Sequence, residues 1–475
     1  MLKMSARKLV RLVFASLVVL SVLALANGAA SSSVGQTDEQ IRQANISTGD
    51  GKQIAPQTNN ITVIATDSNT WFGKAGDGPR ARAELVAFNS NGTVLYYNDS
   101  HTRYWDVDPV EGTETTVEFL YADHLNKSEC GTEVCTRNGV ERVNLSTGAV
   151  TDVYSRITPG KHSTRWHDGD RINDSTYAIA DIAQDRVFVV NTTTGLLEWS
   201  WEAQNDFEPT NSGGPYPEDW THINDVEVLE DGRLMVSLRN HDQIAFLDRE
   251  TGLVENWTLG TDDQHDIIYE QHNPDYIPES QGGPAVLIGD SESNRVVEYQ
   301  RENGEWNRTW MWQDAQMQWP RDADRLPNGH TLITDSNGNR VFEVNQQGDV
   351  VWSVDIAFPY EAERLETGDE SSGGQSASAL GLVSKSTGES SAVDTGKQNG
   401  QKESIVGSAW IEIKNIVPGR YMNGFMYVLP AWMGSTEVFA LLALVFGLLA
   451  WAVTEWRWSS RSLTIPWTVH IERRG

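Results

Sequence analysis

Lysine is scarce in this chain, and basic residues as a class are outnumbered. Only 10 of the 475 residues are lysine, and 66 acidic residues stand against 37 basic ones, which gives a formal net charge of −29. Nucleic-acid partners require basic patches that neutralise the phosphate backbone, so this composition argues against them. A strongly acidic surface keeps a protein soluble, and its self-repulsion is tolerated in high salt. The charge and the low lysine content together predict a halophilic source.

Cysteine is almost absent, with Cys130 and Cys135 five positions apart in a glycine-containing loop. A zinc site would need two further ligands nearby, so a local disulfide, typical of an oxidising exterior, is the better interpretation. Ten Asn-x-Ser/Thr sequons also favour an exported glycoprotein. They begin at Asn45, Asn60, Asn91, Asn98, Asn126, Asn144, Asn173, Asn191, Asn256 and Asn307.

An apolar run near the start of the sequence is short for a membrane span. It extends from Leu12 to Ala26, whereas a span needs about 20 apolar residues. Its end, Ala24-Leu25-Ala26, resembles a cleavage site. The basic residues before it are Lys3, Arg7, Lys8 and Arg11. We interpret residues 1–30 as a signal peptide, with an uncleaved N-terminal anchor as the alternative.

A second apolar run, Val438 to Val453, predicts a transmembrane helix over residues 436–455. Tryptophans flank it where interfacial aromatic residues belong, at Trp432, Trp451, Trp456 and Trp458. Basic residues then follow at Arg457, Arg461, Arg473 and Arg474. The positive-inside rule therefore predicts a cytoplasmic tail over residues 456–475 and an extracytoplasmic position for the body of the chain.

Two segments precede this helix. Residues 366–404 are rich in serine and glycine, are nearly free of aromatic residues, and predict a disordered acidic stalk. Residues 405–435 then form a juxtamembrane segment between the stalk and the helix.

A strand–turn–strand unit repeats six times and defines the fold class. Its turn glycines, spaced 44 to 57 residues apart, are Gly92, Gly148, Gly195, Gly252, Gly304 and Gly348. This spacing is typical of a four-stranded blade, and alternating apolar residues around Asn/Asp/Gly turns are typical of hairpins. A β-sandwich would not repeat one unit at blade length. We therefore predict an all-β fold, a six-bladed β-propeller over residues 61–358.

Aligning the blades places the starts of five inner strands in register. Their second and fourth positions are mostly acidic, and we expect these carboxylates to be architectural, fixing the entry to each strand. Their first positions differ, and are Trp105, His167, Asn224, His272 and Arg321. Two residues earlier, on the same strand face, stand Arg103, Arg165, His222, Glu270 and Trp319. Because inner strands line the channel of a propeller, these side chains predict an axial pocket for a small anionic or aromatic ligand.

Four short motifs on successive blades resemble the arylsulfate sulfotransferases, which are PAPS-independent enzymes built on a six-bladed propeller. The motifs are Trp166-His167-Asp168, His222-x-Asn224, Ser237-Leu238-Arg239 and the Gln-His pairs at His265 and His272. The resemblance implies that a histidine takes a sulfuryl group from a small aryl sulfate donor and that a phenolic or other hydroxyl acceptor collects it, without a cofactor. The resemblance spans residues 61–356 and not the stalk or the C-terminal helix; taken with the apolar runs and the acidic composition, it suggests a membrane-anchored version of the family from a halophilic archaeon.

The resemblance also implies roles for individual residues. Register favours His272 as the nucleophile, because the residues after it lead to the strand at 285–289, whereas His265 falls in the connection from the preceding blade. The other implied catalytic residues are His222, Asn224, Arg239 and His167. We assign His265, Arg321 and Arg165 as an alternative nucleophile or pocket residues, and Trp105 and Trp319 as stacking partners for the aryl ring.

Two other functions remain as alternatives. A metal-dependent hydrolase is disfavoured, because no ligand spacing such as His-x-x-x-His occurs, and we expect no metal site. A non-catalytic surface propeller that binds glycans or scaffolds envelope proteins is the main alternative. The variation of His, Asn and Arg within an otherwise uniform repeat favours the enzyme.

Overall fold

The computed structural model describes residues 6–44, 51–68, 80–131, 134–160, 164–386 and 405–459. The chain divides into two compact units. One comprises Met1–Ser32, Glu403–Trp410 and Trp432–Gly475, and the other comprises Ser33–Lys402 and Ile411–Ala431. Each unit is treated separately below.

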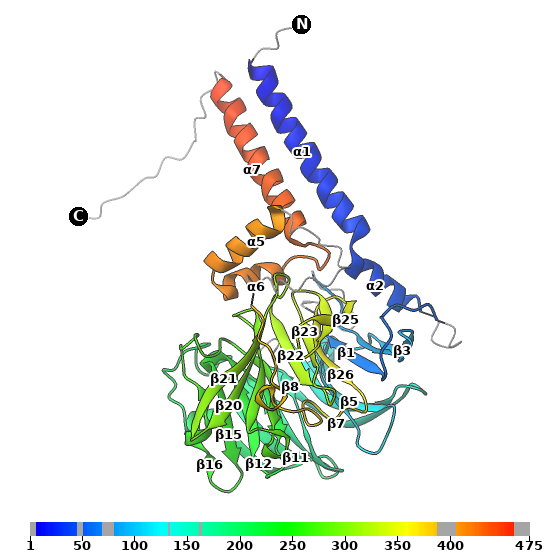
Figure 1. The fold of residues 1–475 in the computed structure, drawn as a ribbon, viewed down its shortest axis with the longest axis vertical. Helices are drawn as coiled ribbons and strands as arrows, with labels where there is room; N and C mark the ends of the chain where they lie inside the picture. Colours follow the sequence, from blue (N-terminus) through cyan, green and yellow to red (C-terminus); the bar gives the residue numbers. More distant parts are fainter. Residues whose placement is uncertain are drawn as a thin grey trace, which may run out of the picture. The chain divides into compact units, whose positions relative to one another are not determined.

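The larger unit contains a six-bladed β-propeller (Figure 1), which confirms the predicted architecture. All its ladders are antiparallel. From the inner strand outward, blade 1 consists of β26 (Pro359–Arg364), β1 (Thr62–Thr66), β2 (Leu85–Phe88) and β3 (Val94–Asn98), and blade 2 of β4 (Arg103–Pro109), β5 (Thr116–Leu125), β6 (Cys135–Asn144) and β7 (Ala149–Pro159). Blade 3 consists of β8 (Trp166–Asp168), β10 (Thr176–Asp181), β11 (Arg186–Asn191) and β12 (Leu196–Glu202), with β9 (Arg171–Asn173) also paired to β10.

The remaining blades follow the same plan. Blade 4 consists of β13 (Ile223–Val228), β14 (Leu234–Leu238), β15 (Gln243–Asp248) and β16 (Gly252–Leu253), with β17 (Leu259–Gly260) also paired to β15. Blade 5 consists of β18 (His272–Ile277), β19 (Ala285–Asp290), β20 (Arg295–Glu302) and β21 (Glu305–Trp312). Blade 6 consists of β22 (Pro320–Arg325), β23 (Thr331–Asp335), β24 (Arg340–Val344) and β25 (Val350–Asp355). The helices are α1 (Ala6–Ser31), α2 (Ser33–Arg42), α3 (Lys127–Cys130), α4 (Ala377–Leu380), α5 (Ile405–Ile416), α6 (Gly419–Tyr427) and α7 (Ser435–Trp458).

Local sequence explains the hairpins. In the turn between β11 and β12, the Asn191 side chain accepts hydrogen bonds from the backbone N–H groups of Thr193 and Thr194, both at 3.1 Å. Gly195 then adopts φ +70°, a left-handed conformation that glycine reaches without steric cost. The flanking β-branched and aromatic residues pack between neighbouring blades, where Val187, Val189 and their neighbours are fully buried.

The propeller extends further along the chain than predicted. β26 pairs with β1, with Ile64 opposite Ala362, and supplies the innermost strand of blade 1. The predicted boundary at residue 358 is therefore wrong, because the ring needs residues 359–364 to cover the inner edge of β1 and close. Because the predicted propeller ended before β26, the comparison of inner strands within the sequence included five strands and not the sixth.

The first half of the expected stalk also packs on the propeller. Ser371 and Ser376 are fully buried, the Ser371 hydroxyl accepts a hydrogen bond from the Arg325 backbone N–H at 2.7 Å, and Ser376 caps α4. The backbone N–H groups of Ser376 and Ala377 bond to the Gln281 carbonyl at 3.0 Å and the Glu298 carboxylate at 2.7 Å, so propeller groups satisfy part of the polar backbone of this stretch, which corrects the stalk prediction for residues 366–386. Residues 387–404 lie outside the described part of the chain.

A ring of carboxylates, called here the acidic belt, occupies the second and fourth positions of the inner strands. Its members are Asp106, Asp108, Asp168, Asp170, Asp225, Glu227, Asp275, Asp322, Asp324, Glu361 and Glu363. Several accept a hydrogen bond from a backbone N–H of the next blade, for example Asp106 from Gly169 at 3.0 Å and Glu361 from Val107 at 2.6 Å. We expected bonds that fix each strand locally, whereas the belt instead joins one blade to its neighbour.

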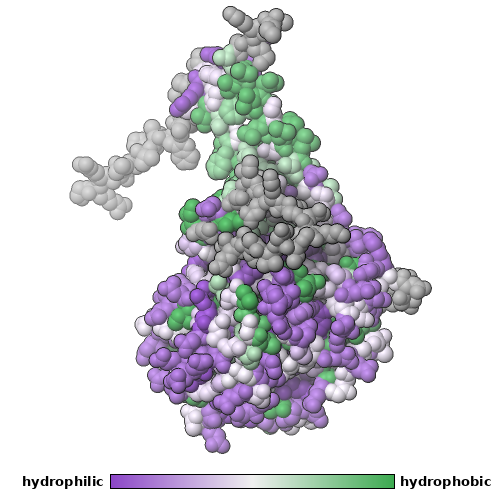
Figure 2. All heavy atoms as spheres, viewed as in Figure 1, coloured by the Kyte–Doolittle hydropathy of each residue, from purple (hydrophilic) through white to green (hydrophobic). Residues whose placement is uncertain are grey.

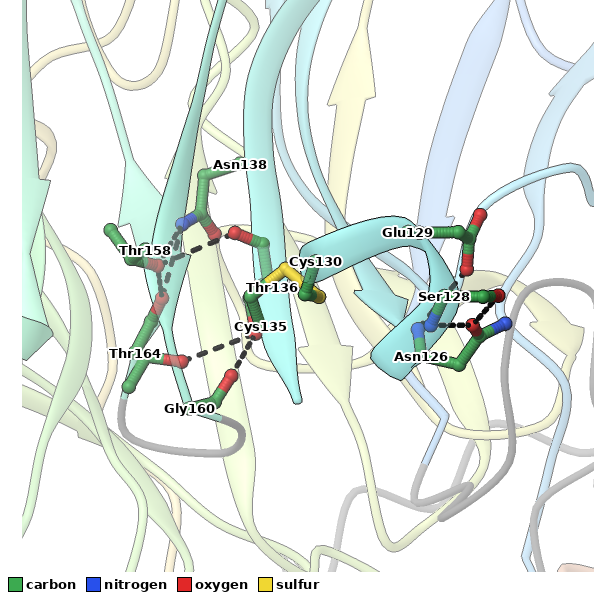
Figure 3. The surroundings of a disulfide bond; sticks show 10 residues. All are labelled: Asn126, Ser128, Glu129, Cys130, Cys135, Thr136, Asn138, Thr158, Gly160 and Thr164. Atoms are coloured by element: carbon green, nitrogen blue, oxygen red, sulfur yellow. Dashed lines mark hydrogen bonds between the residues drawn. A yellow bond between two sulfur atoms is a disulfide. The ribbon is translucent and has the colours of Figure 1, made fainter. Parts of the chain in front are cut away.

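Cys130 and Cys135 are joined by a disulfide at the edge of blade 2 (Figure 3). Cys130 ends α3, whose start is capped by the Asn126 side chain on the Ser128 N–H, and Cys135 begins β6. The disulfide therefore closes the loop between β5 and β6.

The smaller unit contains two helices, α1 and α7, that lie antiparallel to each other (Figure 1). The Arg11 guanidinium bonds to the Glu455 carboxylate at 2.5 and 2.7 Å, and the rings of Phe14 and Trp451 stack at 6.1 Å. Both α7 and the helical stretch Ala6–Arg42 are long and apolar enough to cross a membrane. Hydrophobic residues gather on these helices, while hydrophilic residues dominate the visible propeller surface (Figure 2).

Candidate active site

The first positions of the inner strands converge on the propeller axis. His167, Asn224, His272 and Arg321 are all buried there, together with Trp105. Burial, together with the positive charges of His222, Arg165 and Arg321, lowers the pKa of His167 well below its usual value, so these groups act on one another. The structure thus assembles residues of five blades into one axial cluster.

Blade 1 contributes Tyr360 of β26, which the sequence analysis missed. Its hydroxyl lies 3.0 Å from His167 Nδ1, and its ring lies edge-on to Trp105 at 4.8 Å. The signal was present in the sequence, because Tyr360-Glu361-Ala362-Glu363 repeats the acidic second and fourth positions of the other inner strands.

His272 is a buried, neutral imidazole. Burial and the positive charges of Arg321, Arg239 and His222 lower the pKa of His272 well below its usual value. Since protonation would add a further positive charge to a dry, cationic site, the ring keeps a lone pair at neutral pH. A neutral imidazole is the form that can act as a nucleophile.

The hydrogen bonds of Ser291 define which ring nitrogen carries that lone pair. Ser291 Oγ lies 2.8 Å from His272 Nδ1 and donates its single proton to the Pro320 carbonyl oxygen at 2.7 Å. The Gly289 carbonyl oxygen also lies 3.2 Å from this hydroxyl, so with its proton directed to the carbonyls we assign the hydroxyl as the acceptor and the ring proton to Nδ1 of His272. This tautomer leaves the lone pair on Nε2.

His222 forms a carboxylate–imidazole pair with Asp219. Its Nδ1 lies 2.6 Å from Asp219 Oδ1, and its ring lies edge-on to His167 with centroids 5.3 Å apart. Burial alone would raise the pKa of Asp219, but the His222 charge and hydrogen bond, with Arg239, outweigh it and hold this pKa well below its usual range. Asp219 is therefore ionised and orients His222 with Nδ1–H toward it, which exposes Nε2 to the cluster.

Arginines supply the positive charge of the site. The Arg321 guanidinium lies over the rings of Trp319 at 4.2 Å and Tyr360 at 4.6 Å, and Nη1 lies 3.3 Å from Asp67 Oδ2. Arg103 holds the other oxygen of the same carboxylate at 3.0 Å. Asp67, which the sequence analysis did not select, therefore fixes two guanidinium groups above the channel.

Arg239 and Asn224 occupy the side of blade 4. Arg239 pairs with Glu270, lies 3.9 Å from Glu292, and donates to the Asn240 side chain at 2.8 Å. The Asn224 amide nitrogen donates to the Gln271 carbonyl at 3.0 Å, which fixes the side chain and leaves its second N–H for another acceptor.

The two expected stacking residues differ in their surroundings. Trp105 is buried between His167, stacked at 4.0 Å, and the Arg165 guanidinium at 5.3 Å, so its ring is already engaged. Trp319 instead lines an open cavity of about 450 Å³ next to the axial cluster. Of the two, only Trp319 offers surface to an aryl ring.

Four residues at the mouth of the channel adopt left-handed backbone conformations. They occupy the same position in successive inner strands, two residues before the first position, and are His222 (φ 49°), Glu270 (φ 44°), Trp319 (φ 60°) and Phe358 (φ 52°). Such conformations are costly for large side chains and persist where the surrounding structure enforces them, which is typical of functional sites.

His265 lies apart from the axial cluster, as register predicted. It falls in the connection between β17 and β18, is half-exposed, and stacks on Tyr269 at 3.7 Å. It lines the same 450 Å³ cavity as Trp319 and Arg239.

The helix α6 forms another wall of this cavity, which the sequence analysis did not foresee. Tyr427 packs against Trp319 and Phe358 with ring centroids at 5.8 and 5.5 Å, and Arg420 also lines the cavity. The buried Asn423 side chain anchors the helix by donating to Glu292 at 2.8 Å. The helix lies outside the blade repeat, so no pattern in the sequence linked it to the site.

Residues 151–357 match the model of the arylsulfotransferase (ASST) family. No curated protein matches the chain. Among solved structures, a Bacteroides caccae protein of unknown function is 10% identical (TM-score 0.42; 65% of this chain, 100% of that chain), and a Pseudomonas aeruginosa periplasmic gluconolactonase is 12% identical (TM-score 0.42; 65% and 99%). A putative 6-phosphogluconolactonase from Bacteroides fragilis is 13% identical (TM-score 0.38; 65% and 98%).

Proposed function

We propose that this chain is an arylsulfate sulfotransferase that moves a sulfuryl group from an aryl sulfate to a phenolic or other hydroxyl acceptor through a sulfohistidine on His272. The observation that carries the proposal is the Nε2 lone pair of His272, set by Ser291 and surrounded by Arg321, Arg239 and His222. The match of residues 151–357 to the arylsulfotransferase family supports it.

In the first half-reaction, His272 Nε2 attacks the sulfur of the donor. The bond between sulfur and the aryl oxygen breaks, its electron pair stays on that oxygen, and protonated His222 gives it a proton. The products are a free phenol, a sulfated His272 that keeps its Nδ1 proton on Ser291, and a neutral His222.

In the second half-reaction, the acceptor hydroxyl transfers its proton to His222 Nε2 and its oxygen attacks sulfur. The nitrogen–sulfur bond breaks and its electrons return to His272 Nε2, which restores both histidines. Asp219 stabilises the positive charge that His222 carries before the first step and regains in the second.

The remaining residues neutralise charge and hold the substrates. Sulfuryl transfer, like phosphoryl transfer, spreads negative charge over the peripheral oxygens, so positioned donors supply most of the rate enhancement. Arg321, Arg239 and the second N–H of Asn224 are the donors, and Trp319 stacks on the aryl ring. Arg165 and His167 support the cluster by packing on Trp105 and bonding to Tyr360.

We place the propeller outside the cell, with α1 and α7 as a pair of membrane anchors. Arg7 and Arg11 lie over Trp458, so the basic ends of both helices are adjacent, and the positive-inside rule assigns that end to the cytoplasm. Apolar side chains such as Leu20 and Phe446 are exposed on the helix pair and suit contact with lipid tails.

The test uses full-length protein in detergent with 4-nitrophenyl sulfate, with and without a phenol acceptor, and with a radioactive sulfate donor. We expect wild type to release nitrophenol and to become labelled, and His272→Ala to do neither. His265→Ala and the control His330→Ala, in the turn between β22 and β23 of blade 6, keep the label. Labelling of His272→Ala, or no transfer by wild type, contradicts the proposal, and the second result favours the glycan-binding alternative.

A further inference from the structure

In the described part of the chain, the acidic belt bonds to the backbone of the following blade at every junction between blades except one. Backbone N–H groups of a following blade bond to Asp106, Asp168, Asp170, Glu227, Asp322 and Glu361, which together bridge five of the six junctions. In the described part of the chain, no bond of this kind joins blades 5 and 6. Asp275 of blade 5 instead accepts from the Ser371 hydroxyl in the segment after β26.

Four carboxylates cluster at this junction. Asp275 lies on β18, Asp322 and Asp324 lie on β22, and Glu370 belongs to the segment after β26. One oxygen from each lies within 4.8 Å of the others. Three separate parts of the chain therefore bring negative groups to one point.

Three of these side chains hold an oxygen that is buried and unsatisfied. Asp275, Asp322 and Asp324 are 1%, 1% and 2% exposed. Asp275 Oδ1, Asp322 Oδ1 and Asp324 Oδ2 receive no hydrogen bond from outside the cluster among the described residues, and the side chains that approach them are the other carboxyl groups, Asp322 beside Asp324 and Glu370 beside Asp275. Buried charged oxygens require a donor, an ion partner or a metal, so the cluster lacks a positive group.

The neighbouring arginines do not supply that charge, because they have partners of their own. Arg325 pairs with Glu298 at 3.0 Å, and Arg364 pairs with Glu343 at 3.0 Å. Burial and neighbouring carboxylates accordingly raise the pKa of Asp275 and of Asp324 well above the usual value. Burial raises the pKa of Asp322 to about 7.

We propose that Asp275, Asp322, Asp324 and Glu370 bind one Ca²⁺ ion on the propeller axis, separate from the histidine cluster. Oxygen-only, carboxylate-rich sites suit hard cations, and four carboxylate oxygens that all lie within 4.8 Å of one another can surround one such ion. Mg²⁺ usually keeps several waters and takes one or two carboxylates, so a site with four carboxylates suits Ca²⁺ better. The ion joins blade 5 to blade 6 where the backbone bond is missing, and it holds the segment after β26 in place.

An adjacent cavity gives the ion a route to its site. This cavity of about 110 Å³ is lined by Glu370, Asp369 and Ser372 and by belt residues of blades 2 to 4, including Asp225. Its walls are acidic, so they attract cations from solution.

The experiment compares Ca²⁺ binding by full-length wild type, Asp324→Asn and the control Asp349→Asn, an exposed carboxylate on the outer part of blade 6. After treatment with EGTA, each protein is titrated with Ca²⁺ by calorimetry, and Tm is measured with and without the ion. We expect about one Ca²⁺ per chain for wild type and the control, and a fall in Tm of at least ~5 °C when Ca²⁺ is removed.

Asp324→Asn should bind Ca²⁺ at least ~10-fold more weakly and, because it removes buried charge, should be at least as stable as wild type without Ca²⁺. Asp275→Asn provides the same test if Asp324→Asn does not fold. Absence of Ca²⁺ binding by wild type, equal affinities for Asp324→Asn and Asp349→Asn, or preferential binding of Mg²⁺ would each overturn the proposal.

Discussion

Two rings of side chains line the same channel, and they differ in how they use the repeat. The first positions of the inner strands vary from blade to blade, from Trp105 and His167 to Arg321 and Tyr360, and form the axial cluster. The acidic belt just along the same strands is nearly uniform, with Asp or Glu at most positions. Equivalent positions that stay the same hold neighbouring blades together, and equivalent positions that differ form the proposed active site.

Among the substitutions that distinguish the axial cluster from the acidic belt, a change at Arg321 is expected to have the largest effect. Arg321→Lys keeps the positive charge beside Asp67 but loses the planar fork that holds two sulfuryl oxygens. We expect kcat for aryl sulfate to fall by ~10²-fold or more, with Tm unchanged within about 2 °C. Kinetics and thermal unfolding measure both quantities.

The matched control is Arg233→Lys, whose guanidinium stacks on Trp257 at 3.9 Å in the outer part of blade 4. This change should leave kcat unaltered. Equal losses of kcat in Arg321→Lys and Arg233→Lys would show that the position of Arg321 in the channel gives it no particular role in catalysis.

Substitution of a residue in the acidic belt should lower stability and leave kcat near wild type, which is the opposite of the effect expected for Arg321→Lys. Glu227→Ala leaves the Tyr276 backbone N–H, now bonded at 2.7 Å, without its acceptor. We expect the free energy of unfolding to fall by about 1–3 kcal/mol in urea, with kcat near wild type. Glu227→Gln retains an acceptor oxygen and should restore most of the stability, whereas a loss of kcat in either variant would place the belt in the catalytic machinery.

The acidic belt and the axial cluster should also differ in how pH changes their contribution to stability. Burial raises the pKa of Asp322 and of Asp369 to about 7, so both bind more protons folded than unfolded. Their contribution to stability is full below about pH 4 and is lost as pH rises through 7. In EGTA, we expect Tm to fall by ~5–10 °C between pH 5 and pH 8.

Ca²⁺ should reduce this dependence, because a bound cation stabilises the ionised belt. Asp219, which pairs with His222 beside the axial cluster, does not affect Tm between pH 5 and pH 8, because its pKa is lowered and its stabilising effect is lost only in stronger acid. A Tm that rises between pH 5 and pH 8 in EGTA would contradict the assigned direction.

The smallest effect is expected at the cavity wall. Tyr427→Ala removes the ring that covers Trp319 and Phe358 and widens the cavity. We expect KM for a two-ring phenol acceptor to change by ~5-fold, with little change for phenol itself. Tyr421→Ala, an exposed residue of the same helix, is the control, and equal effects of both variants would exclude a role in acceptor choice.

The sequence was sufficient to predict the propeller and the axial position of His167, His222 and His272, because a repeat of fixed length imposes register. It was insufficient for Tyr427, which lies outside the repeated unit, and for Asp67, which follows β1 of blade 1 and meets Arg103 and Arg321 of other blades only in the folded chain. The serine-rich stretch after β26 was misread for a related reason. Its composition is typical of a linker, but its hydroxyls, such as that of Ser371, bond to propeller groups.

The closing strand β26 has a consequence for the order of synthesis. β1 emerges early and keeps an unpaired inner edge until Pro359–Arg364 has been made and can pair with it. The pocket is completed by Tyr360 on that same late strand, so an incomplete chain has neither a closed ring nor a finished site. A nascent chain that crosses a membrane as it is made would therefore close the ring and complete this site only after Arg364 has reached the far side.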